Sequence, residues 1–422
     1  MNIAIIGNGG REHAIAKIIN KSKKISKVFC IPGNAGTSEL GINLDIDFLD
    51  TSLLLKTLKI NNIKFVIIGP EKPLVDGLGD YLRNHNIKVF GPNRYAAQLE
   101  GSKAFMKKLC KKNNIPTANF KICQKRKEIL NFLKNSKMPV VVKADGLAAG
   151  KGVTICSSAR QVIKVSTEIF KGKFKTSNKV VLEEFLKGEE ASYFIIVDKK
   201  SFSFIGSAQD HKRVGEKETG PNTGGMGAYS PASIINKKVE EKVIKKIIKP
   251  TLLALKKKAK PYTGFLYVGL MIKNNEPYLI EYNVRMGDPE CQVILPRLKT
   301  SLFDIIEAST ENKLNKIKIK WKKIKCMTIV LCSRGYPGNY KKRSIIKNLD
   351  KIRLDKKSII FHAGTKKEKN KFFSNGGRVL NITCLGNNFK KIRKNIIKII
   401  KKINWKDGFF RKDIGWRIIK KI

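Results

Sequence analysis

The sequence is short of acidic residues and of long apolar runs. Asp and Glu together number 34 against 86 Lys and Arg, which leaves a formal net charge of +52. No apolar run approaches the roughly 20 residues that a membrane-spanning helix needs. The N-terminus MNIAIIGNGG has no basic segment before its apolar run, so it does not read as an export signal. We therefore expect a cytoplasmic protein without a membrane partner.

Cysteine and histidine patterns typical of metal sites are also missing. The 8 cysteines include no CxxC pair, and the chain has only 4 histidines. Because structural zinc sites need such ligands at short spacing, we expect reduced thiols and no zinc. We interpret His13 and His211 as polar loop residues.

The basic excess has two explanations. A net charge of +52 favours a polyanionic partner such as nucleic acid. However, the lysines are spread through every segment and accompany many isoleucines and asparagines, as A/T-rich codons produce. We therefore expect no specific nucleic-acid partner, although the charge should help anionic metabolites to reach the protein. A nucleic-acid-binding protein, which would show a steep salt dependence, remains the alternative.

The composition is that of a globular protein, with 42% hydrophobic and 8% aromatic residues over 422 positions. Residues 3–91 alternate short β-rich runs with helical patterns, which predicts a doubly wound α/β domain with a parallel sheet. A small α+β lid should follow, then a segment with a long helix and two strands, and finally a small α+β domain. The predicted boundaries are 1–102, 103–200, 201–325 and 326–422.

Two helices are predicted from their spacing. Apolar residues recur at helical intervals along one predicted helix, with a kink expected at Pro250, and they should form one buried face: Ile235, Val239, Val243, Ile247 and Leu252. Near the C-terminus a basic amphipathic helix carries Ile392, Ile396, Ile399 and Ile403. Such a helix can lie on a membrane, but packing against the preceding strands is the commoner arrangement.

A glycine-rich turn follows the first predicted strand. GNGGREH places Glu12 where a dinucleotide fingerprint has its third glycine, which disfavours a nicotinamide site. A phosphate could still bind, because Gly9 and Gly10 permit close approach of the backbone and Arg11 can fork onto phosphate oxygens. A tight turn with an outward arginine is the alternative, and the motif alone favours neither.

A second glycine-rich segment, KADGLAAGKGV, lies between two predicted strands. Gly146, Gly150 and Gly152 would expose backbone N–H groups to a polyphosphate, while Lys143 and Lys151 supply positive charge. It is not a Walker A loop. The alternative is a mobile hairpin.

The strand that ends in Glu183, Glu184, Phe185 and Leu186 could read an adenine edge with its backbone, and Glu190 could bind ribose hydroxyls. Acidic strand ends are more often simply solvated. The long stretch from Gln209 to Pro231 is predicted to be irregular and functional, because structureless loops of that length are uncommon.

The segment IEYNVRMGDPE is the most informative. On a strand, Glu281, Asn283 and Arg285 would share one face, and Ile280, Tyr282 and Val284 the other. Two oxygen donors beside a guanidinium suit Mg²⁺ and phosphoryl transfer. A salt-bridged edge strand is the alternative.

Motifs along almost the whole chain together resemble the phosphoribosylamine–glycine ligase family, also called glycinamide ribonucleotide synthetases. They are GNGGREHAI, PGNAGT, VIIGPEKPLVDGL, GP…AAQLEGSKAF, IPTA, VVKADGLAAGKGV, EEFLKGEEAS, QDHKRVGEKETGPNTGGMGAYSP, YTGFLY, EYNVRMGDPE, FHAGT, NGGRVL and RKDIGWR. Any one is modest support, but thirteen in this order are specific.

The resemblance implies an ATP-grasp enzyme of de novo purine synthesis, acting as a monomer. It would join glycine to 5-phosphoribosylamine through a glycyl phosphate, giving glycinamide ribonucleotide, ADP and phosphate. The middle segments would then be ATP-grasp domains with a lid. Another ATP-grasp ligase or carboxylase is the alternative, and the segment from Gln209 to Pro231 discriminates because it lies on the substrate side.

The resemblance also implies roles for individual residues. Lys103, Lys143 and the glycine loop would contact ATP phosphates, and the stretch from Glu183 to Leu186 with Glu190 would hold the nucleoside. Mg²⁺ or Mn²⁺ would bind to Glu281 and Asn283, and Arg285 and Lys143 would be catalytic. Gly9, Gly10, Arg11 and Glu71 would bind phosphoribosylamine, and Asp210 and Arg285 would contact glycine. The strand from Leu266 to Ile272 lacks a carboxylate that many ATP-grasp enzymes keep, so waters and phosphates must complete the metal shell.

Overall fold

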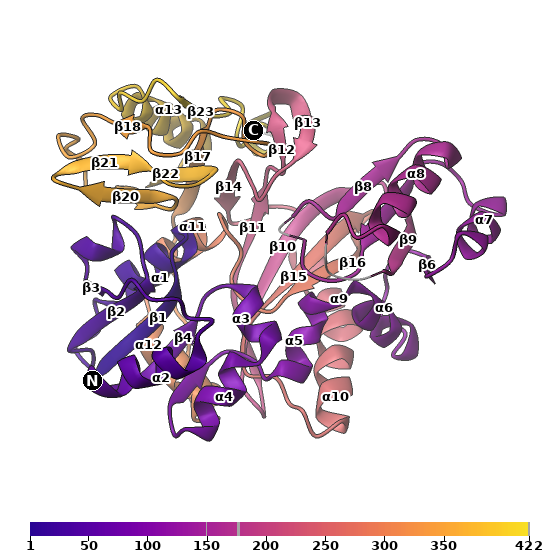
Figure 1. The fold of residues 1–422 in the computed structure, drawn as a ribbon, viewed down its shortest axis with the longest axis horizontal. Helices are drawn as coiled ribbons and strands as arrows, with labels where there is room; N and C mark the ends of the chain where they lie inside the picture. The colour runs from indigo at the N-terminus through magenta and orange to yellow at the C-terminus, as the bar shows by residue number, and fades with distance from the viewer. Residues whose placement is uncertain (149, 175–177, 421–422) are drawn as a thin grey trace.

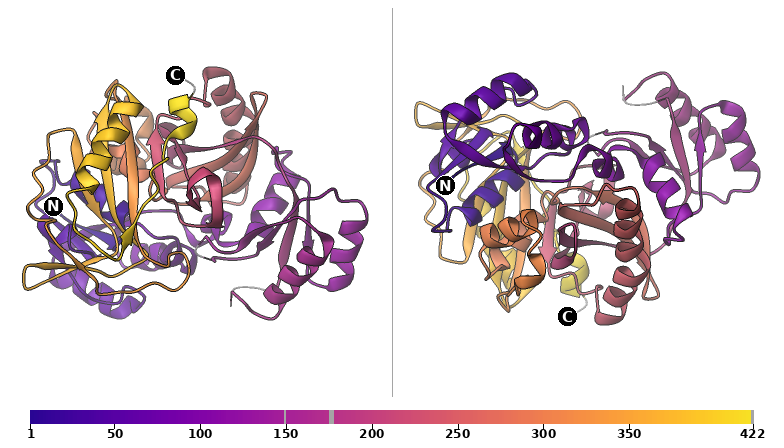
Figure 2. Two further views of the ribbon diagram at one scale, coloured as in Figure 1. Left: turned by 90° about the horizontal axis from the view of Figure 1, so that it is seen from above. Right: turned by 90° about the horizontal axis from the view of Figure 1, so that it is seen from below.

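A computed structural model of the chain describes residues 1–148, 150–174 and 178–420. In Figure 1 the N-terminal and C-terminal parts lie one above the other, the strands of the middle of the chain run beside them, and a lid stands at the opposite end. The lid is also set apart in both views of Figure 2. The multi-domain α/β fold predicted from the sequence is confirmed.

The N-terminal domain contains a five-stranded parallel sheet of order β3-β2-β1-β4-β5. Its alternation of strand and helix arises because parallel neighbours need a crossover between them. The elements are β1 (Asn2–Gly7), α1 (Gly10–Ile19), β2 (Lys27–Pro32), η1 (Thr37–Glu39), β3 (Ile42–Asn43), α2 (Thr51–Ile60), β4 (Ile63–Ile68), α3 (Glu71–Asp76), α4 (Leu78–Asn84), β5 (Lys88–Phe90) and α5 (Arg94–Gly101).

Helix α6 (Lys103–Lys112) leads into the lid, which has a four-stranded antiparallel sheet of order β6-β9-β7-β8. An apolar core of its own, separate from the other cores, holds this sheet against its two helices. The lid elements are β6 (Phe120–Cys123), α7 (Arg126–Lys134), β7 (Val140–Ala144), β8 (Val153–Cys156), α8 (Ala159–Phe170) and β9 (Val180–Glu184). The lid is therefore held together by its own buried side chains.

The largest sheet runs through the middle and C-terminal parts of the chain, in the order β16-β15-β10-β11-β14-β17-β22-β19, with β23 beside β17. Its strands are β10 (Glu189–Val197), β11 (Phe202–Asp210), β14 (Gly227–Ser230), β15 (Gly264–Lys273), β16 (Glu276–Asn283), β17 (Lys325–Ser333), β19 (Ser358–His362), β22 (Arg378–Gly386) and β23 (Gly408–Phe409).

This sheet crosses two of the predicted domain boundaries. Strand β10 was expected in the lid, but it pairs with β11 and β15, so the lid sheet ends with β9. Strand β17 pairs with β14, so one continuous sheet joins the segments that were predicted to be separate domains on either side of residue 325. The sequence pattern could not reveal this, because strand partners are far apart in the chain.

The stretch from Gln209 to Pro231 is more regular than predicted, since it contains the end of β11, two short paired strands and β14. The remaining small strands and turns are β12 (Arg213–Gly215), η2 (Glu216–Glu218), β13 (Thr219–Asn222), β18 (Ile345–Ile346), β20 (Thr365–Glu368) and β21 (Lys371–Ser374).

The long helix is continuous past Pro250 and includes a π-helical segment just before it. The wider π-helical turn accommodates the proline ring, which would clash with the carbonyl of Lys246 in a regular α-helix. The predicted apolar face is buried at Val239, Val243 and Ile247. The segments are α9 (Lys237–Val243), the π-helix η3 (Ile244–Ile248) and α10 (Lys249–Lys257).

The C-terminal amphipathic helix α13 (Phe389–Ile400) packs on β22 and β17, with Ile392 and Ile396 buried. No helix in the described ranges is long and apolar enough to cross a membrane. All eight cysteines are buried and free, as expected. The other helices are α11 (Cys291–Ile294), η4 (Leu295–Arg297), α12 (Leu302–Thr310), η5 (Leu314–Lys316) and α14 (Trp416–Lys420).

Candidate active site

One cavity of about 940 Å³ lies between the N-terminal domain, the lid and the large sheet. Seventeen of the nineteen site residues predicted from the sequence line it. They are Gly9, Arg11, Glu71, Lys103, Lys143, Gly146, Gly150, Gly152, Glu183, Glu184, Phe185, Leu186, Glu190, Asp210, Glu281, Asn283 and Arg285. Segments spread over almost 280 residues of the chain therefore meet at one place.

Two predicted residues lie outside the lining of this cavity, Gly10 and Lys151. A Cβ atom on Gly10 would stand 2.6 Å from both Asn381 Nδ2 and Gln292 Nε2, so this glycine lets three parts of the chain pack together. The side chain of Lys151 is exposed on the glycine loop. Ala149 of the same loop lies outside the described residues.

The glycine loop is tied to the start of α6. Lys103 Nζ donates to the Gly146 carbonyl at 2.9 Å, and the Ala104 amide donates to Asp145 Oδ1 at 3.0 Å. Gly146 and Gly150 adopt φ values of +96° and +75°, which side chains other than glycine rarely tolerate. Burial lowers the pKa of Lys103, against the opposing field of Glu281. The loop and this lysine are thus positioned together beside the cavity.

Lys143 and Glu183 form an ion pair at the cavity wall. Lys143 Nζ lies 2.9 Å from Glu183 Oε1 and also donates to the Ile280 carbonyl at 3.3 Å. Lys107, which the sequence analysis missed, lies behind them, with Nζ 2.8 Å from Glu183 Oε2. Burial lowers the pKa of Lys107, while Glu183 opposes the shift. The Glu183 carboxylate therefore faces two lysines, and its backbone lies along the cavity.

The segment after Glu183 offers an apolar wall with main-chain groups. Glu184 is turned to Asn119, whose amide nitrogen donates to Glu184 Oε1 at 3.0 Å. Phe185 is 36% exposed, and it lines the cavity with Leu186 and with the lid side chains Val141 and Ile155. A flat aromatic base could stack between such side chains.

Strand β16 presents Glu281 and Asn283 to the cavity. Burial alone would raise the pKa of Glu281, but the ammonium groups of Lys212, Lys143 and Lys103 hold it below its ordinary value. Val284 is buried away from the cavity lining, as predicted, whereas Tyr282 is buried but also contributes to that lining. Glu281 and Asn283 therefore share the face that the period of a strand predicts, and the carboxylate stays ionised.

The alternation fails at Ile280, which lines the cavity although it was predicted to face away. The pairing between β15 and β16 shifts by one residue here, from Gly269 opposite Glu281 to Leu270 opposite Leu279. Such a bulge re-aims the neighbouring side chains and turns the Ile280 carbonyl toward Lys143.

The described residues contain no cluster of three or more His, Cys, Asp or Glu side chains arranged as a metal site. Glu281 and Asn283 instead offer one carboxylate and one amide oxygen. This hard donor set fits Mg²⁺ or Mn²⁺, provided that water and phosphate oxygens supply the remaining ligands.

A group of acids surrounds Lys212 next to this pair. Lys212 Nζ lies 3.3 Å from Glu190 Oε2 and 3.8 Å from Glu281 Oε1. Burial raises the pKa of Asp210 to about 7 although Lys212 opposes the shift. Glu290, which sequence reasoning did not select, is buried and accepts a hydrogen bond from Ser192 Oγ at 3.2 Å. A small ammonium ligand would find several oxygen acceptors here.

Arg285 joins the end of β16 to the N-terminal domain. Its Nε lies 3.1 Å from Glu71 Oε2 and its Nη2 lies 2.7 Å from Glu100 Oε1, while Nη1 donates to the Met286 carbonyl at 3.1 Å. Arg285, through its field, lowers the pKa of Glu71 to about 2. Each nitrogen of Arg285 therefore has a partner, and a substrate carboxylate would have to compete for one.

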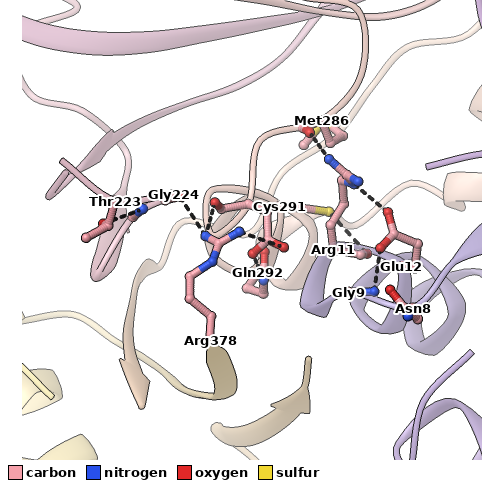
Figure 3. A network of polar contacts seen from close by, with 12 residues as sticks. Asn8, Gly9, Arg11, Glu12, Thr223, Gly224, Met286, Cys291, Gln292 and Arg378 are labelled. Carbon is pink, nitrogen blue, oxygen red and sulfur yellow. Dashed lines mark hydrogen bonds and ion pairs between the residues drawn. The ribbon is translucent and has the colours of Figure 1, made fainter. Parts of the chain in front are cut away.

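Figure 3 shows Arg11 and Arg378 on opposite sides of Cys291 and Gln292, which follow the GDPE segment (residues 287–290) in the chain. Arg11 pairs with Glu12 and donates from Nη1 to the Met286 carbonyl at 3.3 Å. The Gly9 amide donates to Glu12 Oε2 at 2.7 Å, so a phosphate at this turn would compete with Glu12 for that N–H group. An acid at this helix position satisfies orphan amides, and the side chain of Glu12 fills the space beside Gly7, Gly9 and Gly69, where a Cβ atom would clash with it.

Arg378 comes from the C-terminal part of the chain and was not predicted. Its Nη1 donates to the Gly224 carbonyl at 2.6 Å, and its Nη2 lies 3.4 Å from Asp288 Oδ2. It lines the main cavity and also a second one of about 240 Å³, as do Asn8, Gly9 and Asp288. The motifs PGNAGT, FHAGT and NGGRVL supply the other residues of that second cavity. The only sign in the sequence that these segments belong to a site was that they occur among the motifs of the family resemblance.

Both histidines taken for polar loop residues are buried instead. His13 lies in α1, and its Nδ1 accepts a hydrogen bond from the His362 amide at 2.8 Å. His211 Nε2 accepts from the Gly415 amide at 3.1 Å, and burial lowers its pKa to about 3. Each histidine connects its segment to the C-terminal part of the chain.

Comparison with known proteins gives matches to one family over most of the chain. Family profiles described as phosphoribosylglycinamide synthetase match residues 1–100 (N domain), 101–291 (ATP-grasp domain) and 326–417 (C domain). The phosphoribosylamine–glycine ligase of Brucella melitensis is 42% identical over 422 residues, which cover 100% of this chain and 99% of that protein.

Two solved structures are also similar. The crystal structure of phosphoribosylamine–glycine ligase from Thermotoga maritima has a TM-score of 0.85 at 32% identity and covers 98% of this chain and 100% of that one. The biotin carboxylase domain of Hydrogenobacter thermophilus 2-oxoglutarate carboxylase, solved with MgADP, has a TM-score of 0.75 at 12% identity, covers 97% of this chain and 91% of that one, and shares the fold alone.

Proposed function

Because the chain belongs to the phosphoribosylglycinamide synthetase family, we propose that it joins glycine to 5-phosphoribosylamine at the expense of ATP, giving glycinamide ribonucleotide, ADP and phosphate. This is a ligation step of de novo purine synthesis. The observation that carries the proposal is the cavity in which the glycine loop, four lysines, a carboxylate–amide pair and the N-terminal GNGG turn meet.

The chemistry requires activation of a carboxylate, because a carboxylate ion does not acylate an amine at neutral pH. A carboxylate oxygen of glycine attacks the γ-phosphorus of ATP, and the bond between that phosphorus and the β-phosphate oxygen breaks to release ADP. The amine of phosphoribosylamine then attacks the carbonyl carbon of glycyl phosphate. Phosphate leaves and the nitrogen loses a proton. Catalysis by such a site is mainly positioning and electrostatic stabilisation.

The nucleotide is assigned to the lid side of the cavity. The side chains of Val141, Ile155, Phe185 and Leu186 would enclose the base, with the backbone of the last two and of Glu183 and Glu184 reading its edge and Glu190 binding the ribose. Lys103 and Lys143 would contact the phosphates beneath the glycine loop, in which Gly146, Gly150 and Gly152 allow close approach and Lys151 adds charge. Closure of the loop would keep water from the acyl phosphate.

Glu281 and Asn283 would hold Mg²⁺ or Mn²⁺, which neutralises phosphate charge during transfer. Lys212 and Lys143 keep Glu281 ionised for this purpose. Asp210 would receive the ammonium group of glycine, and Arg285 would stabilise the charge of the glycine carboxylate or of the transferring phosphoryl group.

Phosphoribosylamine is assigned to the N-terminal side, with Gly9 and Arg11 toward its phosphate and Glu71 near its ribose or amine. Gly10 would serve this site indirectly, by allowing Gln292 and Asn381 to pack against the turn. We propose that the enzyme acts as a monomer, since residues of this one chain are sufficient to supply every proposed subsite.

The proposal is tested by measuring ADP release with ATP and Mg²⁺ while glycine and phosphoribosylamine are added separately and together. We expect turnover only with both substrates, and glycinamide ribonucleotide as the product. ADP release that needs bicarbonate or another amine would favour a different ATP-grasp enzyme. Absence of turnover together with tight, salt-sensitive binding to duplex DNA would favour the nucleic-acid alternative.

A further inference from the structure

Three charged side chains from three elements form a buried group beside the cavity. Lys107 of α6 is 0% exposed, Glu183 of β9 is 3% exposed and Lys143 of β7 is 5% exposed. The two lysine Nζ atoms lie 2.8 Å (Lys107) and 2.9 Å (Lys143) from different oxygens of the one carboxylate. The group therefore contains two cations and one anion, with a surplus positive charge.

The two lysines are placed differently with respect to the cavity. Lys143 and Glu183 line it, whereas Lys107 lies behind Glu183 and is not part of the lining. Lys107 is held by a second contact, because its Nζ donates to Thr117 Oγ1 at 2.6 Å. Thr117 Oγ1 in turn donates to the Leu279 carbonyl at 2.6 Å, on the large sheet. Lys107 is therefore anchored away from the cavity.

Lys143 has weaker attachments. Besides Glu183, it has only a long hydrogen bond of 3.3 Å to the Ile280 carbonyl among the contacts of the described residues. If its ammonium turns toward a phosphate in the cavity, Lys143 gives up only the contact with Glu183 and this long hydrogen bond. The same turn would leave Glu183 as a buried carboxylate, which is strongly unfavourable unless another cation stays with it.

We propose that Lys107 is a positioning residue that remains on Glu183 and so releases Lys143 to bind the phosphates of the nucleotide. The inference rests on the proposed function, because it takes the anion in the cavity to be ATP. Lys107 acts through Glu183 and does not touch the substrate. Without Lys107, Glu183 would retain Lys143 as its counter-ion, and the phosphates would have to compete with a buried carboxylate.

The experiment measures ATP and adenosine binding to the full chain by isothermal titration calorimetry, with adenosine as the probe that lacks phosphates. The variants are Lys107→Met, Glu183→Gln and the double variant. Lys111→Met, on the exposed side of the same helix, is the matched control. Circular dichroism establishes that each variant is folded.

We expect Lys107→Met to raise the Kd for ATP at least about tenfold while the Kd for adenosine stays within about twofold, because adenosine does not need Lys143. In the double variant the Kd for ATP should return to within about threefold of the wild-type value, since a neutral glutamine needs no counter-ion. The Lys111→Met control should bind both ligands as the wild type does.

Equal losses of ATP and adenosine binding in Lys107→Met, or no rescue by Glu183→Gln, would overturn the inference and indicate a purely structural role. If Lys107→Met does not fold, Glu183→Gln is compared with the double variant. With glutamine at 183, removal of Lys107 should change the Kd for ATP less than about threefold, and a larger loss also overturns the inference. A wild-type chain that binds no ATP would instead overturn the proposed function itself.

Discussion

Replacement of Arg285 with methionine tests the ion network that joins β16 to the N-terminal domain. Methionine fills much of the same volume but carries no charge, so two carboxylates lose their cation. The side chain of Arg285 is 17% exposed, that of Glu71 28% and that of Glu100 7%. Because all three are largely shielded from water, the electrostatic effect should be only partly screened.

The first part of the expected loss comes from Glu71. Its pKa is about 2 in the folded protein, against an ordinary value of 4.5, chiefly because of Arg285. At ~1.4 kcal/mol per pKa unit, this interaction stabilises the fold by up to about 3 kcal/mol at neutral pH. A lowered folded pKa means that the contribution is present above pH 4.5 and is lost as the pH falls toward 2.

The second part comes from Glu100 and has the opposite pH dependence. Burial raises its pKa to about 7 although Arg285 acts against the shift. An acid whose pKa is higher in the folded than in the unfolded state destabilises the fold as it ionises. For Glu100 this cost grows from its unfolded-state pKa of 4.5 up to about pH 7 and then levels off. Without Arg285 the pKa of Glu100 rises further. The variant therefore continues to lose stability above pH 7, by up to ~1.4 kcal/mol per pH unit relative to the wild type.

The assay is urea denaturation at pH 6, 7, 8 and 9, with Arg94→Met as the control because Arg94 is an exposed arginine of the same domain. We expect the free energy of unfolding of Arg285→Met to be about 3 kcal/mol below that of the wild type at pH 6, and this deficit to grow above pH 7. Adding Glu100→Gln to the variant should remove the increase of the deficit above pH 7 and leave the pH-independent loss that comes from Glu71. A deficit below about 1 kcal/mol that is the same at every pH would refute the reasoning.

Three further predictions concern catalysis. Glu281→Ala should abolish ADP formation and leave the far-ultraviolet circular dichroism unchanged, because it removes the carboxylate proposed to hold the metal; near wild-type turnover would exclude that role. Arg11→Ala should raise the KM for phosphoribosylamine more than the KM for ATP, since Arg11 lines the N-terminal side of the cavity; an equal rise in both would contradict its assignment. Increasing salt from 0.05 to about 0.5 M should lower kcat/KM modestly because the +52 charge attracts anionic substrates; a kcat/KM independent of ionic strength would mean that this charge does not assist encounter.

Regular elements were predicted best where one local pattern was sufficient. The apolar spacing predicted a buried helical face that includes Val239 and Val243 and an amphipathic helix that carries Ile392 and Ile396, and the structure contains both. Helical spacing of apolar residues, together with an N-cap such as Ser158, depends on neighbours within a few positions. The assignment of β10 to the lid was wrong because a strand pattern does not state which strand it will pair with.

Candidate site residues were found through residue type and order. The pair Glu281 and Asn283 followed from the period of a strand, but the bulge at Ile280 depends on the pairing with β15 and has no local signal. Glu100 and Arg378 lie within motifs that the resemblance uses and Lys107 lies two residues after one, yet nothing in the sequence stated what each side chain contacts. Lys107 was recognised as part of the site only from the structure, in which this charged side chain is fully buried.

The sequence by itself determined which chemical groups are available, the order of the motifs that carry them, and through these the family and its reaction. The tertiary structure alone decided which groups meet: Lys107 with Glu183 across 76 positions, Arg285 with Glu100 across 185 and Arg378 with Asp288 across 90. The physical reason is that helix and strand periodicity acts over a few residues, whereas the field and hydration at a buried charge depend on every element packed around it.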